Sequence, residues 1–80
     1  VTRDYARAAQ WFWRAAEQGD AEAQYLLGSL YRAGRGVAKD AKKAAHWHGK
    51  SARQGYAKAQ YSYGQMLEHG RGVKRDPDAA

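Results

Sequence analysis

The sequence predicts an all-α protein in which pairs of helices stack into a right-handed α-α superhelix, or solenoid. Seventeen of its 80 residues are alanine, the residue with the highest intrinsic helix propensity. Only four residues are β-branched and isoleucine is absent, so no sheet is expected. The chain also repeats itself, because residues 1–44 aligned with residues 37–80 give 19 identities in 44 positions without a gap. A period of 36 residues is typical of a stacked two-helix unit.

Residues 1–18 are predicted to form the second helix of one such unit. Asp4 stands where an N-cap is expected, with a carboxylate that can accept from the free N–H groups of the first turn. The spacing of the apolar residues predicts that one face of this helix is buried. That face carries Ala9, Trp11, Phe12 and Ala16, and Trp13 lies off it.

The next helix is predicted over residues 21–33, where Ala23, Leu27, Leu30 and Tyr31 share one face. Asp20 is its expected N-cap, and glycines follow its last residue. Glycine reaches the left-handed conformation of a helix C-terminus without steric cost, so Gly34 and Gly36 are expected to end this helix.

A helix over residues 41–54 follows the expected N-cap Asp40, and Gly55 ends it. Its predicted buried residues are Ala44, Trp47, His48, Ser51 and Ala52. The pair Asp76-Pro77 predicts the start of a further helix, with the aspartate as N-cap and proline at the first helical position.

Glycines occur at the same place in two successive first helices, at Gly28 and Gly64. Each costs about 1 kcal/mol of helix propensity relative to alanine. Their recurrence therefore predicts that another helix crosses closely there, the one that carries Trp11 or Trp47.

The chain is thus expected to hold one array, with the second helix of a repeat in residues 1–18, a complete repeat in residues 19–54, and the first helix of the next repeat plus the start of its second in residues 55–80. Because a solenoid needs about three repeats and polar end caps, the sequence is interpreted as a piece of a longer array. The alternative is self-association through the open repeat ends.

Several of these residues together resemble a known family, the Sel1-like repeat, a relative of the tetratricopeptide repeats. The resemblance is carried by the run Ala21-Glu22-Ala23-Gln24-Tyr25-Leu26-Leu27-Gly28, by Tyr31, by the turn Gly34-Arg35-Gly36-Val37 with Lys39-Asp40, and by Ala44, Trp47, Ala52 and Gln54-Gly55. It implies an α-solenoid that acts as an adaptor or scaffold in signalling and assembly, most often in bacteria. The bacterial cytoplasm or periplasm is the compartment it implies.

The residue inventory gives no support to catalysis, so the chain is predicted not to be an enzyme and to need no cofactor. There is no cysteine, hence no thiolate zinc site. His46 and His48 lie two residues apart on a helix and point to different sides, so no metal site is predicted. The Gly-Arg-Gly turn lacks the lysine of a phosphate-binding loop and follows a helix. No stretch has the length and hydropathy of a membrane span.

The net charge of +6 gives one alternative function. Basic residues at helical spacing predict a positive stripe along one helix, suited to nucleic acid or another acidic surface. The stripe has no basic counterpart in residues 1–18, so nucleic acid is not the favoured partner. Its members are Lys42, His46, Lys50 and Arg53.

The favoured function is a non-enzymatic module that binds a protein or peptide on the concave face lined by the first helices. Four exposed positions are predicted there in each repeat. Residues 36 apart differ at all four of these positions, whereas the packing positions beside them are the same in both repeats. Tyr25 and Trp13 are candidate apolar anchors, with Trp13 interpreted first as cover for a preceding helix. The predicted stripe consists of Glu22, Leu26, Ser29 and Ala33 in one repeat and Lys58, Ser62, Gln65 and His69 in the next.

Overall fold

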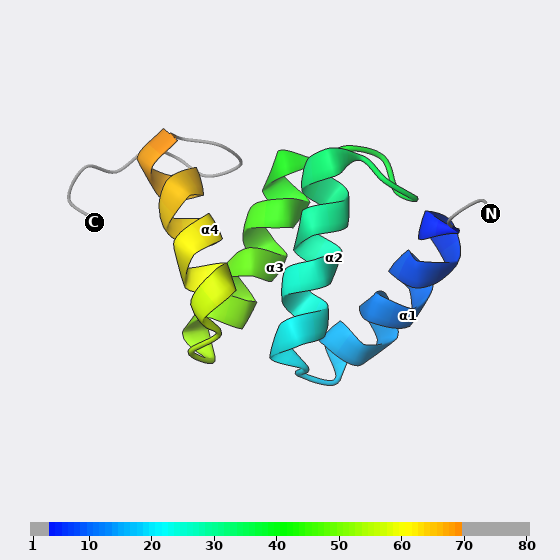
Figure 1. The fold of residues 1–80 in the computed structure, drawn as a ribbon, viewed down its shortest axis with the longest axis horizontal. Coiled ribbons are helices and arrows are strands. Elements are labelled where there is room, and N and C mark those ends of the chain that lie inside the picture. Colours follow the sequence, from blue (N-terminus) through cyan, green and yellow to red (C-terminus); the bar gives the residue numbers. More distant parts are fainter. Residues whose placement is uncertain (1–3, 70–80) are drawn as a thin grey trace.

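A computed structural model describes residues 4–69 of the chain, and within them it contains four α-helices of 13 residues and no strand. The helices follow one another in a row, with α1 at one end and α4 at the other (Figure 1). Each helix packs chiefly on its neighbours in the sequence, which is the arrangement of a solenoid, so the predicted all-α solenoid is confirmed. Their bounds are α1 Tyr5–Glu17, α2 Ala21–Ala33, α3 Ala41–Arg53 and α4 Ala57–His69.

Aspartate side chains start three of these helices. The carboxylates of Asp4, Asp20 and Asp40 each accept from the backbone N–H three residues later, at 2.9, 3.0 and 3.1 Å. Helix α2 ends at Gly34, which adopts the left-handed conformation with φ of +70°. The predicted caps at these positions are therefore confirmed, whereas the Asp76-Pro77 start lies outside the described residues.

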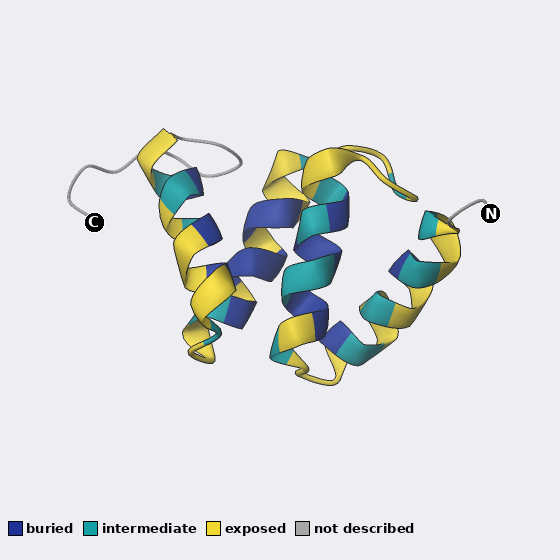
Figure 2. Cartoon of the chain, viewed as in Figure 1, coloured by how far each residue is buried: buried dark blue, intermediate teal, exposed yellow. Residues whose placement is uncertain are grey.

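The core lies along α2 and α3, while α1 and α4 are largely exposed (Figure 2). One cluster joins α1, α2 and α3, and a second joins α3 and α4 with Tyr31 of α2 against it. The side chains are mostly alanine, so the helices approach closely and burial depends on a few large residues. The first cluster contains Ala16, Ala23, Leu27 and Trp47, and the second contains Ala44, Ala45 and Met66.

Trp11 and Trp47 occupy the same place in the repeat but differ in burial. Trp47 is 8% exposed and packs on the cluster formed with α1 and α2, whereas Trp11 is 65% exposed. The prediction that Trp11 is buried is wrong. The physical reason is that α3 packs against the two helices before it, and the described residues contain no helix before α1.

Repeated glutamines tie each first helix to the helix before it. The Gln24 Nε2 donates to the Ala16 carbonyl at 3.0 Å, and the equivalent Gln60 Nε2 donates to the Ala52 carbonyl at 3.3 Å. Gln24 also accepts from Gln54 Nε2 at 2.9 Å, so its side chain links α1, α2 and the C-cap of α3. Identical residues thus perform the same stacking role in both copies.

Two glycines permit close approach between elements. At Gly28 a Cβ would lie 3.1 Å from the Ala44 carbonyl oxygen and from the His48 ring, which confirms the predicted helix crossing there, whereas at Gly64 no described residue comes within 4 Å. The crossing helix is α3, which carries Trp47, although His48 and not the tryptophan meets the glycine. At Gly36, where φ is +73°, a Cβ would collide with the backbone of Tyr5 and Ala6. The turn after α2 therefore rests directly on the first turn of α1.

In the part of the chain that the structure describes, every helix falls short of the length and apolar character that a membrane crossing requires.

Candidate functional site

The first helices, α2 and α4, carry the residues predicted to bind a partner. Most of the predicted stripe reaches solvent: Glu22, Ala33, Lys58 and His69 are exposed. Ser29 and Gln65 are half-buried, and both side chains bond within their own helix. Ser29 Oγ donates to the Tyr25 carbonyl and Gln65 Nε2 donates to the Tyr61 hydroxyl.

Two members of the stripe differ from the prediction. Ser62 is 8% exposed, so its assignment to a binding surface is wrong. The reason is that α4 turns this position toward its neighbours, and a serine is small enough to be enclosed there. Leu26 is half-buried and not freely exposed. The α2/α4 surface is accordingly defined by Glu22, Leu26, Ser29, Ala33, Lys58, Gln65 and His69.

A small cavity of about 150 Å³ lies between the ends of α2 and α4, lined by Arg32, Gln65, Met66 and His69. It brings two predicted residues, Gln65 and His69, together with an arginine that the sequence analysis did not single out. Arg32 immediately precedes Ala33 of the stripe and is exposed. In the sequence, the feature that could have indicated Arg32 as a site residue is its place in the last turn of the helix, beside Ala33.

The predicted basic stripe is exposed at all four positions along α3. This helix contains no acidic residue, and no carboxylate in residues 4–69 forms an ion pair with its cations. Trp47 lies closer to the stripe than expected: the Lys50 Nζ is 5.4 Å from the Trp47 ring centroid, and the His46 ring meets it edge-on at 5.1 Å. Within the described part of the chain, the cations of α3 therefore have no carboxylate as counter-charge.

Trp13 faces the following helices and not a preceding one, so its interpretation as cover for an earlier helix is wrong. Its ring meets Trp47 edge-on with centroids 6.4 Å apart, and 41% of the residue is exposed. It also lines a cavity of about 530 Å³ between α1, α2 and the turn that contains Gly36 and Val37. No local feature of the sequence predicts this cavity, because three separate segments form it. Tyr25, the other candidate anchor, is half-buried between His48 and Tyr56, with ring centroids at 5.3 and 5.5 Å.

His48 is the most unusual polar residue of the core. It is 1% exposed, and neither ring nitrogen has a hydrogen-bond partner. Burial, and secondarily the nearby positive charge of Arg32, lowers the pKa of His48 from 6.5 to about 4. The imidazole is therefore neutral at pH 7, packed beneath Gly28 and against Tyr25. This is the environment of a structural residue and not of an accessible ligand.

Residues 4–69 contain no group of three histidine or carboxylate side chains placed to hold a metal ion. Three of the aspartates are engaged as helix caps. The surfaces described above are consequently suited to contact with another molecule, and none assembles a nucleophile with a base.

Comparison with known proteins identifies relatives over the whole chain. A family model described as Sel1 repeat matches residues 1–20, 21–56 and 57–80. No curated protein matches.

Among solved structures, the crystal structure of a Sel1 repeat protein from Oxalobacter formigenes is similar with a TM-score of 0.92 and 38% identity, covering 95% of this chain and 31% of that chain. The crystal structure of c5321, a protective antigen of uropathogenic Escherichia coli strains displaying an SLR fold, is similar with a TM-score of 0.88 and 45% identity, covering 95% of this chain and 16% of that one. The chain thus spans less than a third of either relative.

Proposed function

The chain belongs to the Sel1 repeat family, and from that premise we propose that it binds a peptide or protein partner through the α2/α4 surface, without catalysing a reaction. Sel1 repeats are generally protein-interaction modules. The proposal concerns which surface of this chain serves that role and which residues contribute.

One observation carries the choice of surface. Some positions where α2 and α4 pack are identical in the two repeats, as at Ala23 and Ala59 and at Gln24 and Gln60, whose side chains both bond to the preceding helix. On the α2/α4 surface every equivalent pair differs, including Glu22 against Lys58 and Ala33 against His69. Because packing does not dictate exposed positions, their side chains are free to suit a partner.

The shape and charge of the surface support the same choice. The cavity beside Gln65 and His69 is mainly polar, and half-buried Leu26 is the apolar residue of the α2/α4 surface that a partner side chain could contact. Glu22 and Lys58 give opposite charges at equivalent places on α2 and α4. A few apolar anchors inside a polar rim are typical of the centre of a protein interface.

The test compares two matched substitutions of exposed alanines. Ala33→Arg adds bulk and charge to the α2/α4 surface, and Ala41→Arg makes the same change on α3, which carries no residue of that surface. Partners captured from a cell lysate by the protein are quantified by mass spectrometry for the wild type and both variants. We expect Ala33→Arg to lose a partner that Ala41→Arg keeps, with unchanged thermal melting. Equal capture by both variants would contradict the proposed surface.

A second candidate function rests on α3, whose cations lack ion-pair partners within the described residues. Such a surface attracts polyanions, and the affinity falls steeply with salt. The double variant Lys50→Glu/Arg53→Glu should abolish retention on immobilised heparin and on single-stranded oligonucleotide if this function is real. Retention that is insensitive to those substitutions would exclude it.

A further inference from the structure

The cavity between α1, α2 and the turn after α2 has no role in the function proposed above. Its volume of about 530 Å³ lies within the range of roughly 300–1,000 Å³ that is usual for ligand sites. Its lining is partly apolar and includes Val37 of the turn, which is half-buried, with the buried Ala9 of α1 and Leu27 of α2. Trp13 supplies an aromatic wall and Arg14 a positive charge at the edge.

The cavity lies on the side of α1 that faces the rest of the described chain. The α1 residues that line it include Ala9 and Trp13, whose equivalents Ala45 and Gly49 are buried in α3. In α3 this side is covered by the next helix, since Tyr63 of α4 lies over Gly49. At the corresponding place α2 carries Leu27, which is shorter. The side chains that face each other at this cavity therefore differ from their equivalents at α3 and α4.

The wall formed by the turn is held in place before any ligand arrives. Gly36 rests against the backbone of Tyr5 and Ala6. The Arg35 guanidinium lies 5.5 Å from the Tyr5 ring centroid, and its Nη1 donates to the Tyr5 hydroxyl at 3.3 Å. A preformed cavity binds without a large cost of ordering the protein.

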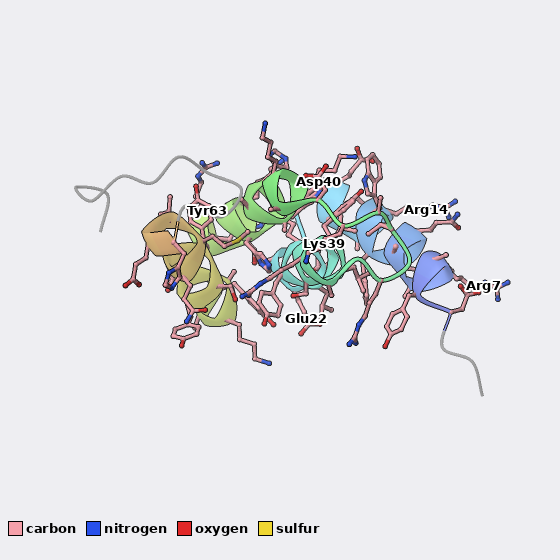
Figure 3. The ribbon with its side chains drawn as sticks, turned by 90° about the horizontal axis from the view of Figure 1, so that it is seen from above. Arg7, Arg14, Glu22, Lys39, Asp40 and Tyr63 are labelled. Atoms are coloured by element: carbon pink, nitrogen blue, oxygen red, sulfur yellow. The ribbon has the colours of Figure 1, made fainter. Side chains whose placement is uncertain are left out.

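The charge around the cavity selects the kind of ligand. No carboxylate lines it, and none in residues 4–69 forms an ion pair with Arg14, which lies 6.0 Å from the Trp11 ring. Gln10 and Arg14 also line a second cavity of about 290 Å³ with Arg7 and Trp11, so the same two side chains contribute to both cavities. Arg7 and Arg14 both project from the α1 end of the molecule (Figure 3).

We propose that the larger cavity binds a bulky apolar side chain of an acidic peptide, with Arg14 pairing with a carboxylate of the same peptide. The cavity excludes water from the apolar side chain, and the exposed face of Trp13 supplies the largest contact. The guanidinium can accept a carboxylate in a bidentate pair. Stacked single-stranded nucleic acid is disfavoured because it needs a row of aromatic platforms, and only one tryptophan lines this cavity.

The probes are three short fluorescein-labelled peptides, measured by fluorescence polarisation on the 80-residue chain. The first has glutamate and aspartate on both sides of a central leucine, the second has alanine at the centre, and the third has lysine flanks around leucine. The acidic leucine peptide should bind at least about tenfold more tightly than either of the others. An equally tight alanine peptide would overturn the proposal, because the cavity would then play no part.

Three variants separate the cavity from general charge attraction. Val37→Trp fills the cavity and Arg14→Glu reverses the charge at its edge, and each should weaken the acidic leucine peptide by about tenfold or more. Arg53→Glu makes the same charge change on α3 and should alter the affinity by no more than about twofold. An equal loss in Arg14→Glu and Arg53→Glu would overturn the proposal.

An NMR titration of the wild-type protein locates the binding site without depending on whether a variant folds. Amide and indole N–H shifts of the wild type are followed by NMR during titration with the acidic leucine peptide. Shifts confined to α1 and residues 34–39, with the Trp13 indole among them, are expected. Shifts centred on α3 or on the α2/α4 surface, or displacement of the peptide by a single-stranded oligonucleotide, would contradict the assignment.

Discussion

The two junctions between successive repeats use the same hydrogen bond but distribute bulk in opposite ways. At the junction of α1 with α2, Trp13 stands opposite Leu27 and a cavity remains beside them. At the junction of α3 with α4, the equivalents are Gly49 and Tyr63, and the tyrosine ring covers the glycine. The glutamine that reaches back to the preceding helix is present in both.

This comparison separates two kinds of position. Residues that set how the helices stack, such as Gln24 and Gln60, are identical between copies, and their hydrogen bonds recur. Residues that fill the space between helices change together, with a large side chain on one helix and a small one on the other. Together Trp13 and Leu27 are larger than Gly49 and Tyr63, and a cavity nevertheless remains beside them at the first junction.

The contact between α1 and the turn after α2 should be destabilised most strongly by a substitution of Gly36. In Gly36→Ala the new methyl group meets the Tyr5 backbone while φ is +73°. The left-handed strain and the collision together should lower the free energy of unfolding by about 4 kcal/mol. Urea denaturation followed by circular dichroism measures the loss.

Gly55→Ala is the matched control for that substitution, because Gly55 has φ of +90° and no atom within 4 Å of the added methyl group. It should show only the backbone strain, about 1–2 kcal/mol. Similar losses in the two variants would mean that the turn does not rest on α1.

The contact between α3 and α4 should be destabilised when Gly49 is replaced by tryptophan, the residue found at the equivalent position Trp13 of α1. In Gly49→Trp the indole competes with Tyr63, whose Cε1 already lies 3.1 Å from a Cβ built at that glycine. Overpacking at a buried contact should cost about 3 kcal/mol. Thermal unfolding measures it, and a loss below about 1 kcal/mol would show that the α3–α4 contact is loose.

A neutral His48 beneath Gly28 predicts a pH-dependent stability of the contact between α2 and α3. Its folded-state pKa of about 4 is lower than the usual 6.5, so the unfolded chain binds the proton more readily. Stability is therefore complete above about pH 6.5 and is lost as the pH falls toward 4, by about 2 kcal/mol between pH 7 and pH 5. Urea midpoints at the two pH values measure the change.

His48→Phe is the control for this effect, because phenylalanine occupies the equivalent position at Phe12. Its stability should vary much less between pH 7 and pH 5. A variant that retains the full pH dependence would place the titrating group elsewhere.

The smallest effect is expected at the two helical glycines. Among the described residues, no atom lies within 4 Å of a Cβ built at Gly64, so Gly64→Ala should gain about 1 kcal/mol of helix propensity. Gly28→Ala should instead lose stability, because the methyl group would meet the Ala44 carbonyl oxygen. Melting temperatures that move in the same direction for both variants would remove this distinction.

Local signals in the sequence predicted much of the fold. The bounds of α2 follow from Asp20, Gly34 and the spacing of the apolar residues, and the structure reproduces them. These features act within a few residues of the chain, where capping and helix geometry decide the outcome. The 36-residue repeat then placed the helices in order.

Burial that depends on neighbours could not be predicted in the same way. Trp11 has the repeat position of Trp47, but exposure depends on which helices pack beside it, and periodicity within one helix does not contain that information. The same holds for Ser62, which neighbouring helices enclose, and for Trp13, whose cavity needs α1, α2 and the turn together. Arg32 was missed because its importance arises only from its proximity to α4.

A double-mutant cycle on Gly49→Trp and Tyr63→Leu tests most directly whether the two junctions exchange bulk between facing helices. The double variant reproduces at α3 and α4 the pair found at Trp13 and Leu27. We expect it to recover at least about 2 kcal/mol of the free energy of unfolding that the two single variants lose when summed. Losses that simply add would mean that these side chains do not share one space, and would contradict the account of both junctions and of the cavity between α1 and α2.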